Sequence, residues 1–339
     1  MERRGRSSRL WQLAALNALA SLFLLASFAR NGIGTPTVGG CTAQIIDFHV
    51  FWSAARLALE GTPLSAFNQD ALNSVVNACD AGWLPWLHPP AGLLLVTPFG
   101  MLALVPAWLA FTAASLLLLF LALRPFVPHG AGVLALIFAP ALLPALLAGQ
   151  FTTLWLAGLL AALWALRNDR WMIAGFCIAG LTLKPTLGLM IPFALLGVGA
   201  WRVIVVATLS TIAIHGLATL VYGFDYWSLL IEVYGLHSLN GIRELGARDT
   251  MTSLAAALAG VGVPGDWAVR VNLMVAVGLA LLVCLTWRRL GPSDVSAALL
   301  TSSIPLATPY LWHYDSAFLA LTALFLARHH GFAPPRLLS

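Results

Sequence analysis

Residues 203–222 read VIVVATLSTIAIHGLATLVY and contain no Asp, Glu, Lys or Arg. An apolar run of about 20 residues is long enough to cross the hydrocarbon core of a bilayer as one helix. The rest of the chain has the same character, since 60% of its 339 residues are hydrophobic and only 9% are charged. Soluble domains carry about 25% charged residues, so this composition excludes an ordinary soluble protein. The sequence predicts an all-α polytopic membrane protein.

Further apolar segments resemble this span, although several are short or interrupted by proline. They are 10–29, 91–105, 107–123 (joined to the previous one by a turn at Pro106), 131–148, 151–166, 171–183, 186–200, 269–287, 295–308 and 316–327. Pro140 and Pro144 predict a broken, partly re-entrant path for 131–148, which a membrane tolerates only where the backbone is buried in protein or lines a cavity. We expect about ten crossings, all in a single domain, 1–339.

The basic residues predict the orientation, because Lys and Arg accumulate on the cytoplasmic side of a membrane. The chain begins MERRGRSSR before its first apolar run. That run is longer than a typical signal-peptide core, so we interpret it as an uncleaved helix with a cytoplasmic amino terminus. This topology places eleven arginines inside and five outside. The net positive charge of the chain therefore reflects its orientation in the membrane, and a nucleic-acid partner is not expected.

Two polar stretches, 30–90 and 223–268, then lie outside. The first contains Cys41 and Cys79, and an oxidising compartment favours a disulfide between them; two unpaired buried thiols are the alternative. Cys177 and Cys284 fall in apolar segments and are expected to be packing residues. The sequence has no Cys/His spacing typical of a metal site. No cofactor is expected, with a divalent metal left open.

The stretch 47–61, DFHVFWSAARLALEG, has the pattern of an amphipathic helix whose aromatic face includes Phe48, Phe51 and Trp52. Such a helix suits the membrane–water interface. Asp47 at its start has two interpretations. It is a helix cap, because aspartate satisfies free N–H groups there, or it is a general base that takes a proton from an acceptor hydroxyl.

Several short motifs, in order along the chain, resemble those of one family. They are DFHVF at 47–51 with Gly61, WLHPP at 86–90 with Pro98, Gly149-Gln150, Ala174-Gly175, Lys184-Pro185 and PYLWHY at 309–314. This set is similar to glycosyltransferase family 87, which includes polyprenol-phosphate-mannose-dependent mannosyltransferases of the GT-C class. The resemblance covers residues 10–328. The chain departs from the family pattern at 65–67 (SAF) and 251–254 (MTSL).

The resemblance implies a GT-C-type bundle in the inner membrane of a bacterium, with an active site facing the periplasm. The implied reaction moves a sugar, mannose by default or arabinofuranose, from a polyprenyl-phosphate donor to a glycan or glycolipid acceptor, with inversion and with Asp47 as general base. A nucleotide-sugar site is not expected, because the chain has no Asp-x-Asp pair. A transporter or flippase for lipid-linked sugars is the alternative, since broken helices and an intramembrane lysine also occur in transporters.

Other polar residues are candidates for binding the donor. Lys184, the only lysine of the chain, is costly in a membrane unless it meets an anion such as a lipid phosphate; a snorkelling lysine is the alternative. The remaining candidates for the donor phosphate or sugar are His313, Gln150, His88, Arg56, Arg243 and Arg248. The alternatives are that His313 lies among aromatic residues at the membrane–water interface, that Gln150 hydrogen-bonds to free backbone groups of the broken helix, and that the arginines are solvated. By the predicted topology Asp47, His88, Lys184 and His313 all face the outside or a cavity open to the outside.

Overall fold

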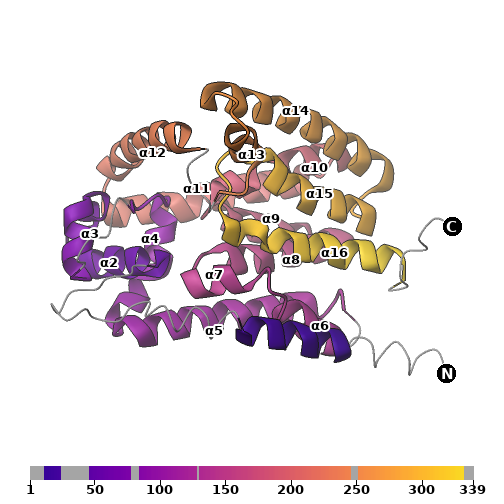
Figure 1. The fold of residues 1–339 in the computed structure, drawn as a ribbon, viewed down its shortest axis with the longest axis horizontal. Coiled ribbons are helices and arrows are strands. Elements are labelled where there is room, and N and C mark those ends of the chain that lie inside the picture. The colour runs from indigo at the N-terminus through magenta and orange to yellow at the C-terminus, as the bar shows by residue number, and fades with distance from the viewer. Residues whose placement is uncertain (1–10, 24–45, 78–83, 128–129, 246–250, 332–339) are drawn as a thin grey trace. The chain divides into compact units, whose positions relative to one another are not determined.

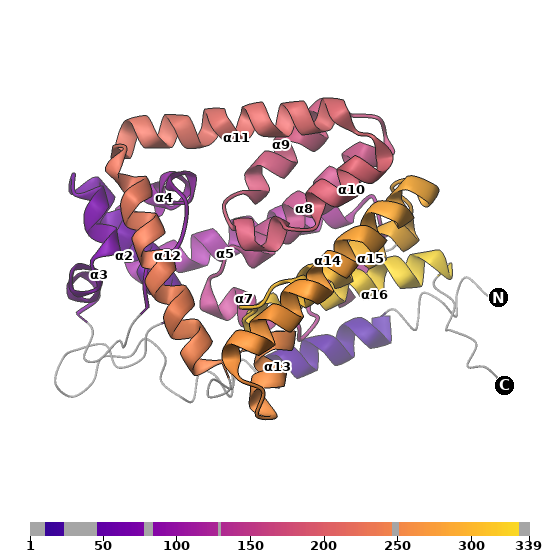
Figure 2. The same ribbon diagram turned by 90° about the horizontal axis from the view of Figure 1, so that it is seen from above.

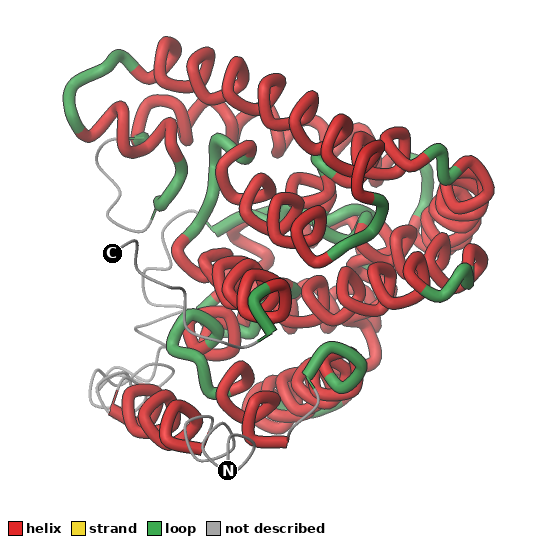
Figure 3. The backbone as a smooth tube through the Cα atoms, turned by 90° about the vertical axis from the view of Figure 1, so that its right-hand side faces the viewer, coloured by secondary structure: helices red, strands yellow, loops and turns green. Residues whose placement is uncertain are grey.

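The computed structural model describes residues 11–23, 46–77, 84–127, 130–245 and 251–331, and these ranges are helical with no β-strand (Figures 1 and 3). The chain forms two compact units. Unit 1 comprises Met1–Leu118, His129–Thr153 and Ile212–Leu239, and unit 2 comprises Leu119–Pro128, Leu154–Thr211 and Asn240–Ser339. The prediction of an all-α fold is confirmed for the described part, whereas a single domain stays a prediction.

Unit 1 consists of short helices and parts of long ones. They are Trp11–Phe23, α2 (Asp47–Leu59), the 3₁₀ helix Pro63–Phe67, α3 (Gln69–Val75), α4 (Pro90–Val96) with the 3₁₀ turn Thr97–Met101, α5 (Leu104–Leu123, as far as residue 118), α6 (Gly130–Ile137), α7 (Leu143–Ala148), the second half of α11 (Trp201–Tyr222) and most of α12 (Asp225–Glu244). The predicted break in 131–148 is confirmed. Pro144 lies in the first turn of α7, where its missing N–H costs nothing.

The predicted turn at Pro106 is wrong by a few residues. The break comes earlier, because α5 already begins at Leu104 and takes Pro106 into its first turn, where proline is tolerated because the N–H it lacks would have no partner within the helix. The preceding segment is a seven-residue helix followed by a 3₁₀ turn rather than a span.

The helix predicted at 47–61 forms as α2, and most of its aromatic face is buried, although Trp52 stays partly exposed. Phe48 and Phe51 are only 1% and 3% exposed. The Phe48 ring lies 5.5 Å from that of Phe111, and the Phe51 ring lies 4.7 Å from that of Phe151. An apolar helix face fits a protein interior as well as a membrane surface, and here protein side chains cover it.

Unit 2 is a bundle of apolar helices. It contains α8 (Thr152–Arg167, from residue 154), α9 (Trp171–Leu181), the 3₁₀ helix Pro185–Gly188, α10 (Ile191–Val198), the first half of α11, α13 (Leu254–Gly260), α14 (Gly265–Leu290), α15 (Asp294–Ala307), the 3₁₀ turn His313–Ala317 and α16 (Phe318–His329). Helix α14 packs against α10 and α15, and α15 packs against α16 (Figure 2). The polar stretch 223–268, predicted as a loop, is mostly helical, because α12, α13 and the start of α14 occupy it.

Three described helices are long and apolar enough to cross a membrane: Leu104–Leu123, Trp201–Tyr222 and Gly265–Leu290. The helix predicted at 203–222 is therefore confirmed, with the length and composition of a membrane span. Large apolar side chains on it are open, Ile212 at 63% and Leu220 at 75% exposure, which suits contact with lipid. The chain is a membrane protein, and the total of about ten crossings stays a prediction.

Candidate functional site

Asp47 is the first residue of α2, and Ile46 occupies the cap position. The carboxylate of Asp47 accepts a hydrogen bond from the Nε2 amide of Gln150, which follows α7. A carboxylate in the first helical turn is also favoured by the helix dipole. Asp47 is therefore not the cap of α2 but a residue of its first turn, and its carboxylate contacts a side chain 103 residues away in the sequence.

Gly149 explains how Gln150 reaches Asp47. Its φ of +66° is left-handed and ends α7, a conformation that glycine adopts without strain. A Cβ atom at this position would lie 2.6 Å from the Cβ of Phe48. Only a glycine therefore lets the end of α7 approach α2 this closely, and the next residue then lies beside Asp47.

Gln150 is 6% exposed, and its Oε1 has no hydrogen-bond partner among the described residues. An ionised carboxylate only accepts, so the amide N–H groups face Asp47 and the carbonyl oxygen is left for another donor. A buried oxygen without a donor costs about 1–3 kcal/mol. The sequence predicts the donor phosphate or sugar, or free backbone groups, as partners of Gln150; in the structure its amide donates to the carboxylate of Asp47, and a contact with the donor stays a prediction.

His88 joins the same neighbourhood through aromatic contacts. Its ring meets Phe51 edge-on at 5.0 Å and Phe151 at 4.7 Å, and Phe151 directly follows Gln150. The backbone carbonyl of His88 accepts a 2.9 Å hydrogen bond from the Tyr226 hydroxyl, which in turn accepts one from Trp86 Nε1 at 2.6 Å. Burial raises the pKa of the Tyr226 phenol, so it stays a neutral donor.

His49, on the first turn of α2, is held by the backbone. Its Nδ1 accepts a 3.2 Å hydrogen bond from the N–H of Ile46. Burial lowers the pKa of the imidazole, so the ring is neutral at physiological pH. The described residues contain no cluster of three or more His, Cys, Asp or Glu arranged for a metal ion.

Of the three predicted arginines, only Arg56 can be placed relative to Asp47. Arg56 lies nine residues further along α2, about 13 Å away along the axis. It contacts Glu60 at 3.6 Å and is 43% exposed, which is typical of a solvated arginine. Arg243 is a residue of α12. Arg248, Cys41 and Cys79 lie outside the described residues, so their roles and the disulfide stay predictions.

A second group of polar residues lies in unit 2, at the break between α9 and α10. Lys184 occupies that break, as predicted, at the cap of the 3₁₀ helix Pro185–Gly188. Its Nζ lies 2.8 Å and 3.0 Å from the two carboxylate oxygens of Asp315. The two side chains are only 12% and 3% exposed. The ammonium also lies 4.8 Å from the centroid of the Tyr314 ring, within cation–π range.

Asp315 is an anion that was not expected beside Lys184. The sequence predicts that Lys184 meets an anion such as a lipid phosphate, and in the structure the chain itself supplies one in Asp315; a contact of Lys184 with a lipid phosphate stays a prediction. The signal was available, because a lone lysine in an apolar setting needs a carboxylate and Asp315 directly follows the PYLWHY motif. His313 of this motif is exposed, at the start of the 3₁₀ turn, with its ring 5.4 Å from that of Tyr314.

The residues just before this turn pair with residues 251–252. Met251 forms an antiparallel bridge with Trp312, and the N–H of Thr252 donates to the carbonyl of Leu311 at 2.9 Å. Ser253 caps α13 by accepting from the N–H of Ala256. The MTSL and PYLWHY elements thus form one local structure although nearly sixty residues separate them in the sequence.

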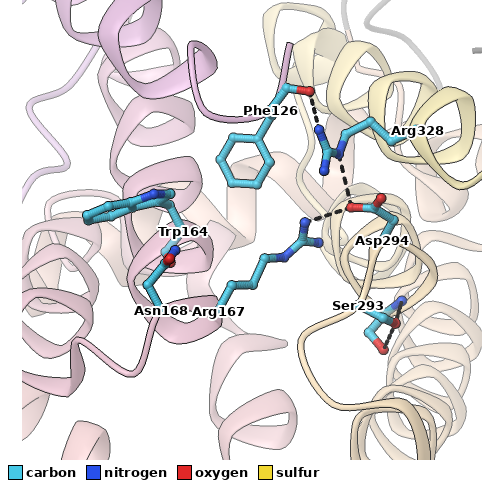
Figure 4. Close-up of polar contacts among 8 residues, drawn as sticks. Phe126, Trp164, Arg167, Asn168, Ser293, Asp294 and Arg328 are labelled. Atoms are coloured by element: carbon cyan, nitrogen blue, oxygen red, sulfur yellow. Dashed lines mark hydrogen bonds and ion pairs between the residues drawn. The ribbon is translucent and has the colours of Figure 1, made fainter. Parts of the chain in front are cut away.

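A third polar cluster in unit 2 was not predicted. Asp294, in the first turn of α15, lies between the guanidinium groups of Arg167 and Arg328, at 2.7 Å and 3.1 Å (Figure 4). Arg328 also donates to the backbone carbonyl of Phe126. These contacts connect the ends of α8, α15 and α16, so the cluster is best explained as a clamp on the bundle.

The structure thus brings Asp47, Gln150 and His88 into one neighbourhood of unit 1. Lys184 and His313 share another neighbourhood in unit 2, with Asp315 as an addition. The convergence of all these residues on one site stays a prediction.

One family model, that of glycosyltransferase family 87, matches residues 86–309. The matched stretch is more than half of the chain and includes His88, Gln150 and Lys184, while Asp47 precedes it and His313 follows it. None of the curated proteins or solved structures compared with the chain matches it.

Proposed function

Because the chain belongs to glycosyltransferase family 87, we propose that this membrane glycosyltransferase takes its sugar from a polyprenyl-phosphate carrier. The sugar is mannose, and the acceptor is a hydroxyl of a glycan or glycolipid. The reaction takes place on the outer face of a bacterial inner membrane, in a GT-C-type bundle of about ten crossings with a cytoplasmic amino terminus. An arabinofuranose donor is the other candidate.

Asp47 is the general base of this proposal. The acceptor hydroxyl gives its proton to the carboxylate while its oxygen forms a bond to the anomeric carbon. The bond from that carbon to the phosphate oxygen breaks, and the electron pair leaves with the polyprenyl phosphate. A single displacement of this kind inverts the anomeric centre. The observation that carries the proposal is the hydrogen bond from Gln150 to the Asp47 carboxylate.

Gln150 acts on the base rather than on the donor in this mechanism. Its amide orients one carboxylate oxygen and favours the ionised form, which is the form that accepts a proton. Its buried Oε1 accepts a hydrogen bond from a hydroxyl of the acceptor or the sugar. The close contact of Gly149 with Phe48 makes this arrangement rigid, as a positioned base requires.

Lys184 and His313 donate hydrogen bonds to the leaving phosphate as negative charge develops on its oxygens. His88 contributes to the sugar site from its place among the rings of Phe51 and Phe151. Arg243 and Arg248 stay candidates for phosphate contacts, whereas the exposed position of Arg56 argues for a solvated role. No resident cofactor is required by this chemistry, and activity in the presence of a chelator tests that point.

The test is transfer by the purified, full-length protein. Candidate lipid-linked sugars are supplied in detergent, and mass spectrometry follows free polyprenyl phosphate and the glycosylated acceptor. Accumulation of both with polyprenyl-phosphate mannose supports the proposal. If no lipid-linked sugar is consumed with any acceptor tried, the proposal is wrong.

A flippase is the second candidate, because the interrupted helix at Lys184 is also a feature of transporters. Membership of a transferase family argues against it. In proteoliposomes without an acceptor, a flippase would move fluorescent donor between leaflets, whereas the transferase is expected to leave its distribution unchanged.

A further inference from the structure

Lys184 is proposed to bind a phosphate, yet its ammonium is already ion-paired with the carboxylate of Asp315. The lysine is the only one in the chain, and its carboxylate partner is almost completely buried. Both carboxylate oxygens lie within 3.0 Å of the ammonium. As a unit the pair carries no net charge, so its attraction for an anion is much weaker than that of a lone lysine.

The charge of the lipid ligand changes during the proposed reaction. The donor is a phosphate diester with one negative charge, whereas the product is a monoester with about 1.5 to 2 negative charges near neutral pH. A lone buried cation would therefore hold the spent carrier more tightly than the incoming donor. Such a site would be inhibited by its own product.

We propose that Asp315 is a positioning residue that sets the affinity of the site for the polyprenyl phosphate product by neutralising Lys184. The carboxylate fixes the ammonium beside Tyr314 and offsets its charge, so the spent carrier is released after transfer. This inference rests on the proposed function, because it takes the lipid phosphate as the ligand of Lys184.

The test measures binding of a polyprenyl monophosphate, without sugar, to the purified full-length protein. Asp315→Asn keeps the shape of the side chain and removes its charge, so the dissociation constant is expected to fall about tenfold or more. Product inhibition of transfer should strengthen in parallel, and the KM for the singly charged donor should fall by less.

Asp294→Asn is the matched control, since Asp294 is also ion-paired within unit 2 but to arginines. The affinity of the Asp294→Asn protein for the monophosphate should stay at the wild-type value. A purely structural role of Asp315 predicts unchanged or weaker binding by Asp315→Asn, and either result would overturn the inference.

Removing one partner of a buried pair destabilises proteins, so Asp315→Asn is accompanied by a variant without either charge. Lys184→Gln combined with Asp315→Asn replaces both partners, so that neither charge is left buried without its counter-ion. If the wild-type pair acts as a neutral unit, this double variant binds the monophosphate within about threefold of wild type. A loss of tenfold or more would show that the charge of Lys184 acts unattenuated and would overturn the inference.

The inference and the proposed function fail in different ways. If wild type transfers sugar and binds the monophosphate but Asp315→Asn does not bind it more tightly, only the role of Asp315 is wrong. If wild type neither transfers sugar nor binds the monophosphate, the proposed function fails as well.

Discussion

Each of the two units contains an acidic residue that contacts a polar side chain distant in the sequence, and these two contacting side chains differ in charge. In unit 1 the carboxylate of Asp47 receives a neutral amide from Gln150. In unit 2 the carboxylate of Asp315 receives the ammonium of Lys184. The first pair keeps one negative charge and the second has none. A neutral amide can orient a carboxylate and leave its negative charge unchanged, so Asp47 can still accept a proton. An ammonium neutralises the carboxylate, so Asp315 can position Lys184 and offset its charge.

Replacing the neutral partner of Asp47 by a cation should remove the difference in charge between the two pairs. Gln150→Lys gives Asp47 the kind of partner that Asp315 has, and a neighbouring cation makes a carboxylate a weaker base. We expect turnover to fall by about a hundredfold, within the range that general base catalysis contributes. Initial rates of sugar transfer check this, with Gln12→Lys, an exposed glutamine of unit 1, as the matched control. Wild-type turnover in Gln150→Lys would show that the charge of the Asp47 pair is irrelevant.

The reverse exchange makes the second pair resemble the first. Lys184→Gln leaves a negative charge beside Tyr314, which repels the lipid phosphate. The KM for the donor should rise about tenfold or more and turnover should fall. Lys184→Arg keeps the charge and is expected to retain most of the donor affinity. If both variants lost donor affinity equally, the shape of Lys184 rather than its charge would be responsible.

The contact that builds the first pair has a smaller expected effect. Gly149→Ala adds a Cβ 2.6 Å from the Cβ of Phe48 at a left-handed φ, so α7 must withdraw from α2. We expect a loss of about 1–3 kcal/mol in the free energy of unfolding and a turnover reduced about tenfold as Gln150 moves from Asp47. Gly223→Ala, also at positive φ but with nothing within 4 Å of the added atom, separates backbone strain from the packing clash. Equal effects in both variants would mean that the contact with Phe48 is unimportant.

The smallest effect is expected at Arg56. The side chain is 43% exposed and forms an ion pair with Glu60, and exposed pairs of this kind contribute about 0–1 kcal/mol. Arg56→Ala should therefore keep the KM for the donor within about twofold of wild type. A tenfold rise in the KM for the donor would show that Arg56 contacts the donor.

The features that follow from local pattern were predictable, and those that depend on distant contacts were not. The span at 203–222, the break between α6 and α7 and the interruption at Lys184 follow from composition and from proline. The pairing of Asp47 with Gln150 and of Lys184 with Asp315 joins residues 103 and 131 positions apart. No periodicity reports such contacts, and the aromatic pattern of α2 fits a membrane surface and a protein core equally well.

The central claim is that the carboxylate of Asp47 removes the acceptor proton. The most direct measurement compares Asp47→Asn with wild type in transfer from polyprenyl-phosphate mannose, together with donor binding. Asp70→Asn, an exposed aspartate in the first turn of α3, is the matched control and should match wild type. The account predicts that Asn at position 47 lowers turnover by about 10²–10⁴-fold while the dissociation constant of the donor stays nearly constant. Transfer by Asp47→Asn at the wild-type rate would contradict it.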